Sequence, residues 1–238
     1  MKSLPALWAT CLLILVLSSC NSGGKDIDSP FNQTPSNHSE TPKDTNNATV
    51  SKEGVAEVYE NTNRVIWQKP EMIINLMGKL EDKVVADIGA GRGYFTFPLA
   101  EKAKKVIAID IDRRFINYLD SAKVYELPDQ YQNKLETRLG LESDPRLKPA
   151  EVDVVLIVNT FMYIPNKLEY LKSLKNCLSE NGQLIIVDFK KKRTPLGPPS
   201  DIRMPLFEVE ELLYQTGYSK ISTNDTALDY QYIIVADK

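Results

Sequence analysis

Histidine is almost absent from this sequence of 238 residues, which contains one, His38, together with three cysteines and two tryptophans. A single histidine argues against a histidine-based catalytic triad and against a multi-histidine metal site. The cysteines, Cys11, Cys20 and Cys177, are too few for a disulfide framework and lack the paired short spacings that hold zinc or an iron–sulfur cluster. The sequence therefore predicts no metal site.

A large excess of one charge and a long apolar run are also missing. Basic side chains number 29 and acidic ones 32, a net charge of −3, which disfavours a strongly basic nucleic-acid binder, so no nucleic-acid partner is predicted. The apolar stretch at residues 4–17 falls short of the ~20 residues that a membrane-spanning helix needs. With 42% hydrophobic residues the chain suits one well-buried domain and is marginal for two.

Residues 1–19 have the organisation of a secretory signal peptide. Lys2 precedes the apolar stretch, and small residues lead to Cys20. The ending Leu17-Ser18-Ser19-Cys20 resembles the lipobox of bacterial lipoproteins, in which the cysteine is lipidated and becomes the first residue after cleavage. This resemblance implies a lipid on Cys20 and a place in the bacterial cell envelope, anchored to a membrane on its periplasmic or surface side. An uncleaved signal anchor or a mis-assigned start codon is the alternative.

Residues 20–51 are rich in Ser, Thr, Asn, Asp, Gly and Pro and contain His38. Such a composition cannot bury enough apolar surface to fold, so we expect a disordered tether that spans on average ~30 Å. Removal of residues 1–19 takes away Lys2 and no acid, so 29 basic groups become 28 against 32 acidic ones, a net charge of −4. Negative charge weighs against polybasic adhesion to the membrane, which leaves the lipid to provide that contact. The folded domain is expected at residues 52–238.

Strand-like and helix-like patterns alternate in the folded part. Buried, β-rich runs occupy residues 83–88, 105–110, 152–158 and 183–189, with a weaker strand at 135–139 and a closing pair at 221–224 and 230–236. Helices are expected at 70–80, 94–103, 113–123 behind an Asp112 cap, and 166–178 closed by Gly182, with another possible within 54–67. Alternation of this kind predicts an α/β fold, a Rossmann-like, doubly wound and mostly parallel sheet with helices on both faces.

A glycine-rich loop follows the first strong strand and reads Asp87-Ile88-Gly89-Ala90-Gly91-Arg92-Gly93. Glycines let a ligand lie against bare backbone at a helix N-terminus, but dinucleotide-binding folds use a similar turn. Asp87 would repel a pyrophosphate and attract a ligand that carries an ammonium and a sulfonium. Asp110 ends the second strand, where a carboxylate can accept hydrogen bonds from both ribose hydroxyls. No Lys-Ser or Lys-Thr follows the glycines, which excludes a P-loop.

The segment from Asp87 to Gly93, together with Asp110, resembles the first two cofactor motifs of class I S-adenosylmethionine-dependent methyltransferases. The resemblance extends from about Tyr59 to the C-terminus. Three further segments resemble one bacterial branch of that family: Arg64-Val65-Ile66-Trp67-Gln68-Lys69-Pro70, Val158-Asn159-Thr160-Phe161 and Gly197-Pro198-Pro199.

This resemblance implies S-adenosylmethionine as the cofactor and a methyltransferase as the activity. The implied cofactor-binding residues are Asp87, Gly89, Ala90, Gly91, Gly93, Asp110, Ile111, Asp144 and Asn159. In such enzymes the glycine loop holds the methionine portion and the acid after the second strand holds the ribose. The adenine contact maps onto Leu141-Glu142-Ser143-Asp144-Pro145, with Asp144 as the first candidate and Ser143 as the next.

Ordinary structural roles compete with several of these assignments. Asp87 is alternatively a strand-end turn residue and Asp110 a helix cap. Asn159, Thr160 and Tyr163 follow the fourth strand at the edge where ligands collect, as active-site groups or as turn formers.

The aromatic and basic residues near this edge have two interpretations as well. Trp67 either closes over the cofactor or packs in the core. The run Lys190-Lys191-Lys192-Arg193 either attracts an anionic acceptor or forms a solvated surface, and residues 194–205 either cap the acceptor site or connect two elements stiffly. Cys177 is expected to be a small packed residue.

Methyl transfer from a sulfonium requires orientation of the reactants more than covalent chemistry from the protein. The folded part has no histidine base, so Asn159, Tyr163 and Asp188 are the catalytic candidates, the last two as bases. The acceptor is not identified by the sequence, and a small molecule is favoured over a macromolecule. Because S-adenosylmethionine is made inside cells, a non-catalytic lipoprotein module that binds this cofactor or a nucleoside is the alternative function. A nicotinamide-dependent oxidoreductase is disfavoured by Asp87.

Overall fold

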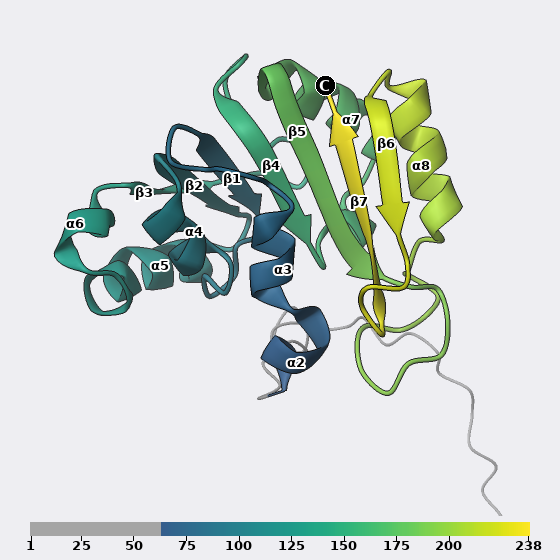
Figure 1. The fold of residues 1–238 in the computed structure, drawn as a ribbon, viewed down its shortest axis with the longest axis horizontal. Coiled ribbons are helices and arrows are strands. Elements are labelled where there is room, and N and C mark those ends of the chain that lie inside the picture. The colour runs from purple at the N-terminus through teal and green to yellow at the C-terminus, as the bar shows by residue number, and fades with distance from the viewer. Residues whose placement is uncertain (1–62) are drawn as a thin grey trace, which may run out of the picture. The chain divides into compact units, whose positions relative to one another are not determined.

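The computed structural model describes residues 63–238, which form one open, seven-stranded sheet with helices on both faces (Figure 1). The predicted signal peptide and tether, with Cys11, Cys20 and His38, lie outside the described residues. The strands are β1 (Val84–Ile88), β2 (Lys105–Asp110), β3 (Leu135–Leu139), β4 (Val152–Val158), β5 (Leu178–Phe189), β6 (Ser219–Asn224) and β7 (Gln231–Asp237).

The strand order is β3-β2-β1-β4-β5-β7-β6. Strands β1 to β5 are mutually parallel, and β7 runs antiparallel to both β5 and β6. This arrangement confirms the predicted mostly parallel, doubly wound sheet. The order reverses at β1, which pairs with β2 on one side and β4 on the other, and ligands of open α/β sheets bind outside the carboxyl ends of the strands at such a switch point.

The helices are α2 (Arg64–Gln68), α3 (Pro70–Asn75), α4 (Thr96–Lys102), α5 (Arg113–Glu126), α6 (Asp129–Gln132), the short 3₁₀ helix η1 (Phe161–Tyr163), α7 (Lys167–Cys177) and α8 (Leu206–Gln215). Helices α3, α4 and α5 cover one face of the sheet, and α7 and α8 cover the other (Figure 1). Because both faces are covered, the central strands are buried on both sides, which explains their nearly continuous Val, Ile and Ala runs.

Most of the expected elements are confirmed, with exceptions among the helices. Asp112 caps α5 as predicted, since its side chain accepts a hydrogen bond from the Arg114 N–H at 2.8 Å. The predicted closure of α7 at Gly182 is wrong, because α7 ends at Cys177 and the chain enters β5 directly. Helix α3 ends at Asn75, earlier than expected, and α8 was not predicted. Within residues 63–238, no helix has the length and apolar content needed to cross a bilayer.

Candidate functional site

The glycine loop is attached to the end of the neighbouring strand β2. The backbone N–H groups of Gly89 and Ala90 both donate to the carbonyl oxygen of Ile109, at 2.8 and 3.1 Å. Gly89, Gly91 and Gly93 all have positive φ angles, of 78°, 54° and 83°. The loop therefore has a backbone path that side-chain-bearing residues rarely adopt.

The three glycines are required for different reasons. A Cβ atom at Gly89 would overlap the side chain of Thr160, so this glycine brings the loop against the end of β4. A Cβ at Gly93 would overlap the Phe97 ring, so this glycine serves the packing of α4. Gly91 alone of the three has nothing within 4 Å of its Cβ position. The bare backbone that a ligand can approach is therefore at Gly91.

Asp87 lies at the end of β1 and is 3% exposed. Its carboxylate accepts a hydrogen bond from the Thr96 hydroxyl at 2.6 Å. Burial raises the pKa of Asp87 to about 6, with a smaller increase from the nearby Asp110, while the Thr96 bond and the charge of Arg64 act in the opposite direction. Thr96 was not identified as a site residue from the sequence. Its position at the start of the helix that follows the loop was a signal that could have found it.

Asp110 lies at the end of β2, across the loop from Asp87, and is 8% exposed. One carboxylate oxygen accepts from the Gly91 N–H and the other from the Asp112 N–H, both at 2.9 Å. Burial raises the pKa of Asp110, and these backbone donors partly oppose the increase. Two buried carboxyl groups therefore border one loop, and a cationic ligand would favour the ionised form of both.

The segment after β3 reaches the same edge of the sheet. The Gly140 N–H donates to the Asp110 carbonyl at 2.9 Å, and Leu141 pairs with Asp144 across a tight turn. The Asp144 carboxylate accepts from the Arg146 N–H at 2.7 Å, within its own loop. Ile111 and Leu141 expose 49% and 47% of their surface here, so two apolar side chains are available to a planar ring.

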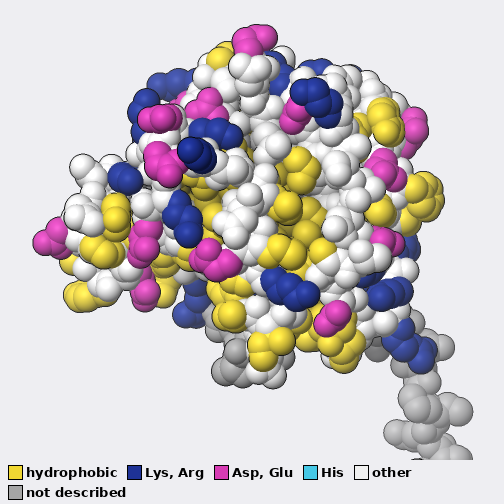
Figure 2. Space-filling view, viewed as in Figure 1, with side chains coloured by type: hydrophobic (Ala, Val, Ile, Leu, Met, Phe, Trp, Pro, Cys, Tyr) yellow, Lys and Arg dark blue, Asp and Glu magenta, His cyan; other side chains and the backbone are white. Residues whose placement is uncertain are grey.

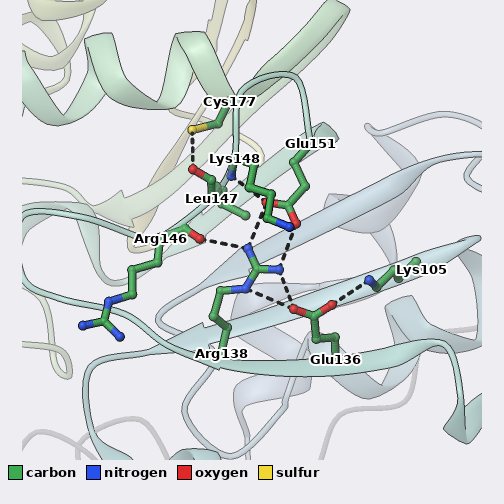
Figure 3. A network of polar contacts seen from close by, with 8 residues as sticks. All are labelled: Lys105, Glu136, Arg138, Arg146, Leu147, Lys148, Glu151 and Cys177. Atoms are coloured by element: carbon green, nitrogen blue, oxygen red, sulfur yellow. Dashed lines mark hydrogen bonds and ion pairs between the residues drawn. The ribbon is translucent and has the colours of Figure 1, made fainter.

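An ion-pair network fixes this segment from the other end (Figure 3). Arg138 on β3 pairs with Glu136 and, at 2.9 Å, with Glu151, and it also donates to the Arg146 carbonyl at 3.0 Å. The hydrogen bond from Arg138 is the main reason why the pKa of Glu151 falls to about 2. Cys177 donates to the Leu147 carbonyl at 3.5 Å, and burial raises the pKa of its thiol, as suits a packed residue.

Asn159 and Thr160 occupy the turn after β4. Asn159 has a φ of 56° and is 6% exposed. Its Oδ1 accepts a hydrogen bond from Gln231 on β7, and its Nδ2 is buried without a hydrogen-bond partner. The Thr160 hydroxyl donates to the Val158 carbonyl at 3.0 Å. Tyr163 in η1 is 42% exposed, so of the predicted residues in this turn it is the most accessible.

Asp188 has no exposed surface. One of its oxygens accepts from the Met162 N–H at 3.0 Å and the other has no partner, and burial raises the pKa of this carboxyl to about 8. A carboxyl with no exposed surface that accepts from the Met162 N–H supports the backbone of η1. The structure therefore favours a supporting role over that of a base.

Trp67 packs rather than lining an open space. It is 4% exposed, and its ring centroid lies 5.8 Å from that of Phe189 and 6.2 Å from that of Tyr230.

Residues 194–205 are ordered around a buried arginine. Arg203 is 4% exposed and donates to the carbonyls of Pro198 at 2.7 Å and Lys192 at 3.0 Å and to the Thr194 hydroxyl at 2.8 Å. These contacts favour a stiff connection. Of the preceding basic run, Lys191, Lys192 and Arg193 are exposed.

The residues at this edge fit a cofactor with an ammonium, a sulfonium and a ribose. The fit rests on the open backbone at Gly91, the two buried carboxyl groups and the orphaned amide nitrogen of Asn159. No group of three His, Cys, Asp or Glu side chains among residues 63–238 has the arrangement of a metal site. The fold is of the class I methyltransferase type.

Comparison with known proteins agrees with this class. Residues 86–184 match the family described as "Methyltransferase domain". A solved S-adenosylmethionine-dependent methyltransferase from Aquifex aeolicus is 24% identical, with 76% of this chain and 96% of that chain covered and a TM-score of 0.68. A putative type 11 methyltransferase from Sulfolobus solfataricus is 23% identical, with coverages of 71% and 91% and a TM-score of 0.57. Residues 86–184 therefore form a methyltransferase domain, and the fold is that of solved S-adenosylmethionine-dependent methyltransferases, a class whose cofactor is S-adenosylmethionine.

The match to curated relatives covers a smaller share of their length than the match to these solved structures does. The tRNA U34 carboxymethyltransferase of Actinobacillus succinogenes is 28% identical over 122 residues, which are 50% of this chain and 36% of that protein. The protein of the same name from Cellvibrio japonicus is 29% identical over 119 residues, with the same coverages. The chain thus spans about a third of the length of these relatives, and their named substrate is a property of those proteins.

Proposed function

We propose that this protein transfers a methyl group from S-adenosylmethionine to a small-molecule acceptor. The observation that carries the proposal is the pair of buried carboxyl groups, Asp87 and Asp110, on either side of a loop whose backbone is open at Gly91. Burial of two acids so close together is unfavourable for the empty protein, and it suits a ligand that brings positive charge and hydroxyl groups.

The chain's own residues would bind and orient the reactants. S-adenosylmethionine supplies, when bound, a methyl group activated by its positively charged sulfur. Asp87 provides the negative charge that favours a cation, and Asp110 provides acceptor oxygens for ribose hydroxyls. Orientation of this kind contributes up to ~7–11 kcal/mol of barrier lowering in well-oriented reactions.

The lack of a ready catalytic base narrows the range of acceptors that the site could methylate. The only histidine, His38, lies in the expected tether, and Asp188 is buried with a pKa of about 8, so it is largely protonated at neutral pH. Of the three predicted catalytic candidates, Tyr163 is the exposed one. An acceptor that is soft, such as sulfur, or already ionised would need no base and fits this site best.

Charge distribution supports a small molecule over a nucleic acid as the acceptor. On the face shown in Figure 2, basic and acidic side chains lie interspersed around a central area of hydrophobic and uncharged atoms. A nucleic-acid partner is expected to require a continuous basic surface, and the net charge of the chain is −3. The match to the tRNA-modifying relatives covers 50% of this chain and 36% of the first of them, and it carries no acceptor with it.

The proposal includes an anchor. A lipid on Cys20 would hold the domain at a membrane of the bacterial envelope, on the periplasmic or surface side, through the tether at residues 20–51. The signal-like pattern and the Leu-Ser-Ser-Cys ending support this part. Labelling of the full chain with radioactive fatty acid tests it, and a Cys20→Ala variant that retains the label would exclude Cys20 as the anchor.

Calorimetry on the full chain tests the cofactor assignment. We expect binding of S-adenosylmethionine and S-adenosylhomocysteine and no binding of NAD. Asp87→Ala and Asp110→Ala should each abolish binding, whereas Asp82→Ala, an exposed acid outside the site, should leave it unchanged. Failure of the unmodified chain to bind either sulfur nucleoside would remove the proposal. Binding without methyl transfer to any envelope component would favour the non-catalytic module.

A further inference from the structure

Four side chains form a continuous chain of hydrogen bonds across the carboxyl end of the sheet. Arg64 donates from Nε to Oε1 of Gln68 at 2.6 Å, and Gln68 donates from Nε2 to Oε1 of Gln231 at 3.2 Å. Gln231 then donates from Nε2 to Oδ1 of Asn159. The chain of bonds connects helix α2 with the start of β7 and the turn after β4, segments that are separated by 163 and 72 positions in the sequence.

The direction of every bond in this series follows from its first member. A guanidinium has only donors, so Gln68 must present its oxygen to Arg64 and its nitrogen to Gln231. The same requirement passes to Gln231 and then to Asn159, whose oxygen is occupied. The side-chain amide of Asn159 is therefore fixed with Nδ2 as its unused end, and that nitrogen is buried without a partner.

The amide side chains in this series are buried, which bears on why they are there. Gln68 and Gln231 have no exposed surface, and Asn159 is 6% exposed. Buried amides are unfavourable unless they are bonded, and an apolar pair of the same shape would hold α2 against the sheet equally well. A series of buried amides that ends in an unused donor is explained if a ligand supplies the final acceptor.

The two ends of the series border the methionine side of the expected cofactor site. Asn159 precedes Thr160, whose side chain abuts the glycine loop at Gly89. Arg64 lies 3.9 Å from the centre of the Tyr94 ring, and its charge lowers the pKa of Asp87. An amide donor and a nearby cation together suit a carboxylate.

We propose that Gln68 and Gln231 are positioning residues that fix the amide of Asn159 so that its Nδ2 donates to the carboxylate of the cofactor's amino-acid portion. This inference rests on the proposed function, because it requires that a sulfur nucleoside binds at the glycine loop.

Calorimetry with two ligands separates positioning from a purely structural role. S-adenosylhomocysteine carries the amino-acid portion, and 5′-methylthioadenosine lacks it. Gln68→Leu and Gln231→Leu should each weaken S-adenosylhomocysteine binding by about tenfold, as expected for one hydrogen bond to a charged group, and leave methylthioadenosine binding unchanged. Tyr218→Phe is the matched control, since it removes a buried hydrogen bond of 3.2 Å to Leu171 away from this edge.

A second set of variants keeps the test independent of folding. Gln231→Glu preserves the volume and the acceptor for Gln68 but has no N–H for Asn159, so it should show the same selective loss. In an Asn159→Ala background, Gln231→Leu should cause no further loss. The melting temperature of each variant is measured in parallel.

The possible results have different consequences. Equal loss for both ligands, or no loss for either, would overturn the positioning role and leave the proposed function intact. Failure of the unmodified full chain to bind S-adenosylhomocysteine would overturn the proposed function and this inference together.

Discussion

Replacement of Asp87 by asparagine should stabilise the empty protein while it weakens cofactor binding. Asp87 is 3% exposed, and burial raises the pKa of its carboxyl to about 6 from 3.8. Asparagine keeps an oxygen that accepts from Thr96 and removes the charge whose burial is unfavourable. The substitution therefore separates the stability of the site from its function.

The sign and the size of the effect follow from the pKa. A carboxyl whose folded-state pKa is raised binds protons more tightly in the folded state, so the stability of the wild type falls as the pH rises from 3.8 through about 6. The difference of roughly two pH units, at ~1.4 kcal/mol for each, gives an upper value of about 3 kcal/mol. Asp87→Asn should raise the free energy of unfolding by up to this amount at pH 8 and by about half of it at pH 5.

Urea unfolding of the ligand-free wild type and Asp87→Asn at pH 5 and pH 8 measures the difference. Calorimetry at pH 8 should show weaker binding of S-adenosylmethionine to the same variant, because its positive charges lose their counterion. Lower stability of Asp87→Asn at pH 8, or a stability difference that is the same at both pH values, would refute the reasoning.

Three further substitutions address the parts of the protein that hold the site. Gly89→Ala should lower the free energy of unfolding by about 2 kcal/mol or more, because a methyl group there meets Thr160 and the φ angle is 78°. Urea titration measures this loss, and an unchanged unfolding midpoint would contradict the prediction. Arg138→Met should lower the free energy of unfolding by about 1–2 kcal/mol at pH 7. The loss should shrink below pH 4.5, because the lowered pKa of Glu151 stabilises the fold above that pH and this stabilisation disappears as the pH falls through about 2. Arg203→Leu should leave buried carbonyls unpaired. Limited proteolysis should then cut within residues 190–198 in the variant and leave this segment intact in the wild type.

Local chemistry made several elements predictable. The strand bounds at 105–110 and 152–158 match β2 and β4, because runs of Val, Ile and Leu on strands buried on both faces are visible without knowledge of the neighbours. The bounds at 135–139 match β3, whose Leu-Glu-Thr-Arg-Leu sequence is a weaker signal because most of this strand is only partly buried. The Asp112 cap was predictable for a similar reason, since a cap bonds to a residue two positions away. Helix α8 was overlooked although Pro205 precedes a periodic apolar pattern, so the signal was present.

Other residues were not predictable because their partners are distant in the sequence. Gln68 and Gln231 resemble ordinary polar residues until the fold brings α2 against β7 and both lose all contact with water. Asp188 had a plausible place as a base at the end of its strand, and only its complete burial against η1 favours a supporting role instead.

The sequence by itself determined the class of fold and the two acids that flank the glycine loop, because periodicity and loop chemistry are encoded within short segments. The tertiary structure decided which glycine faces open space, which acids are buried deeply enough for their pKa to change, and which way the amide of Asn159 points. These properties depend on exclusion of water and on contacts between strands far apart in the chain, so they exist only after the sheet has assembled.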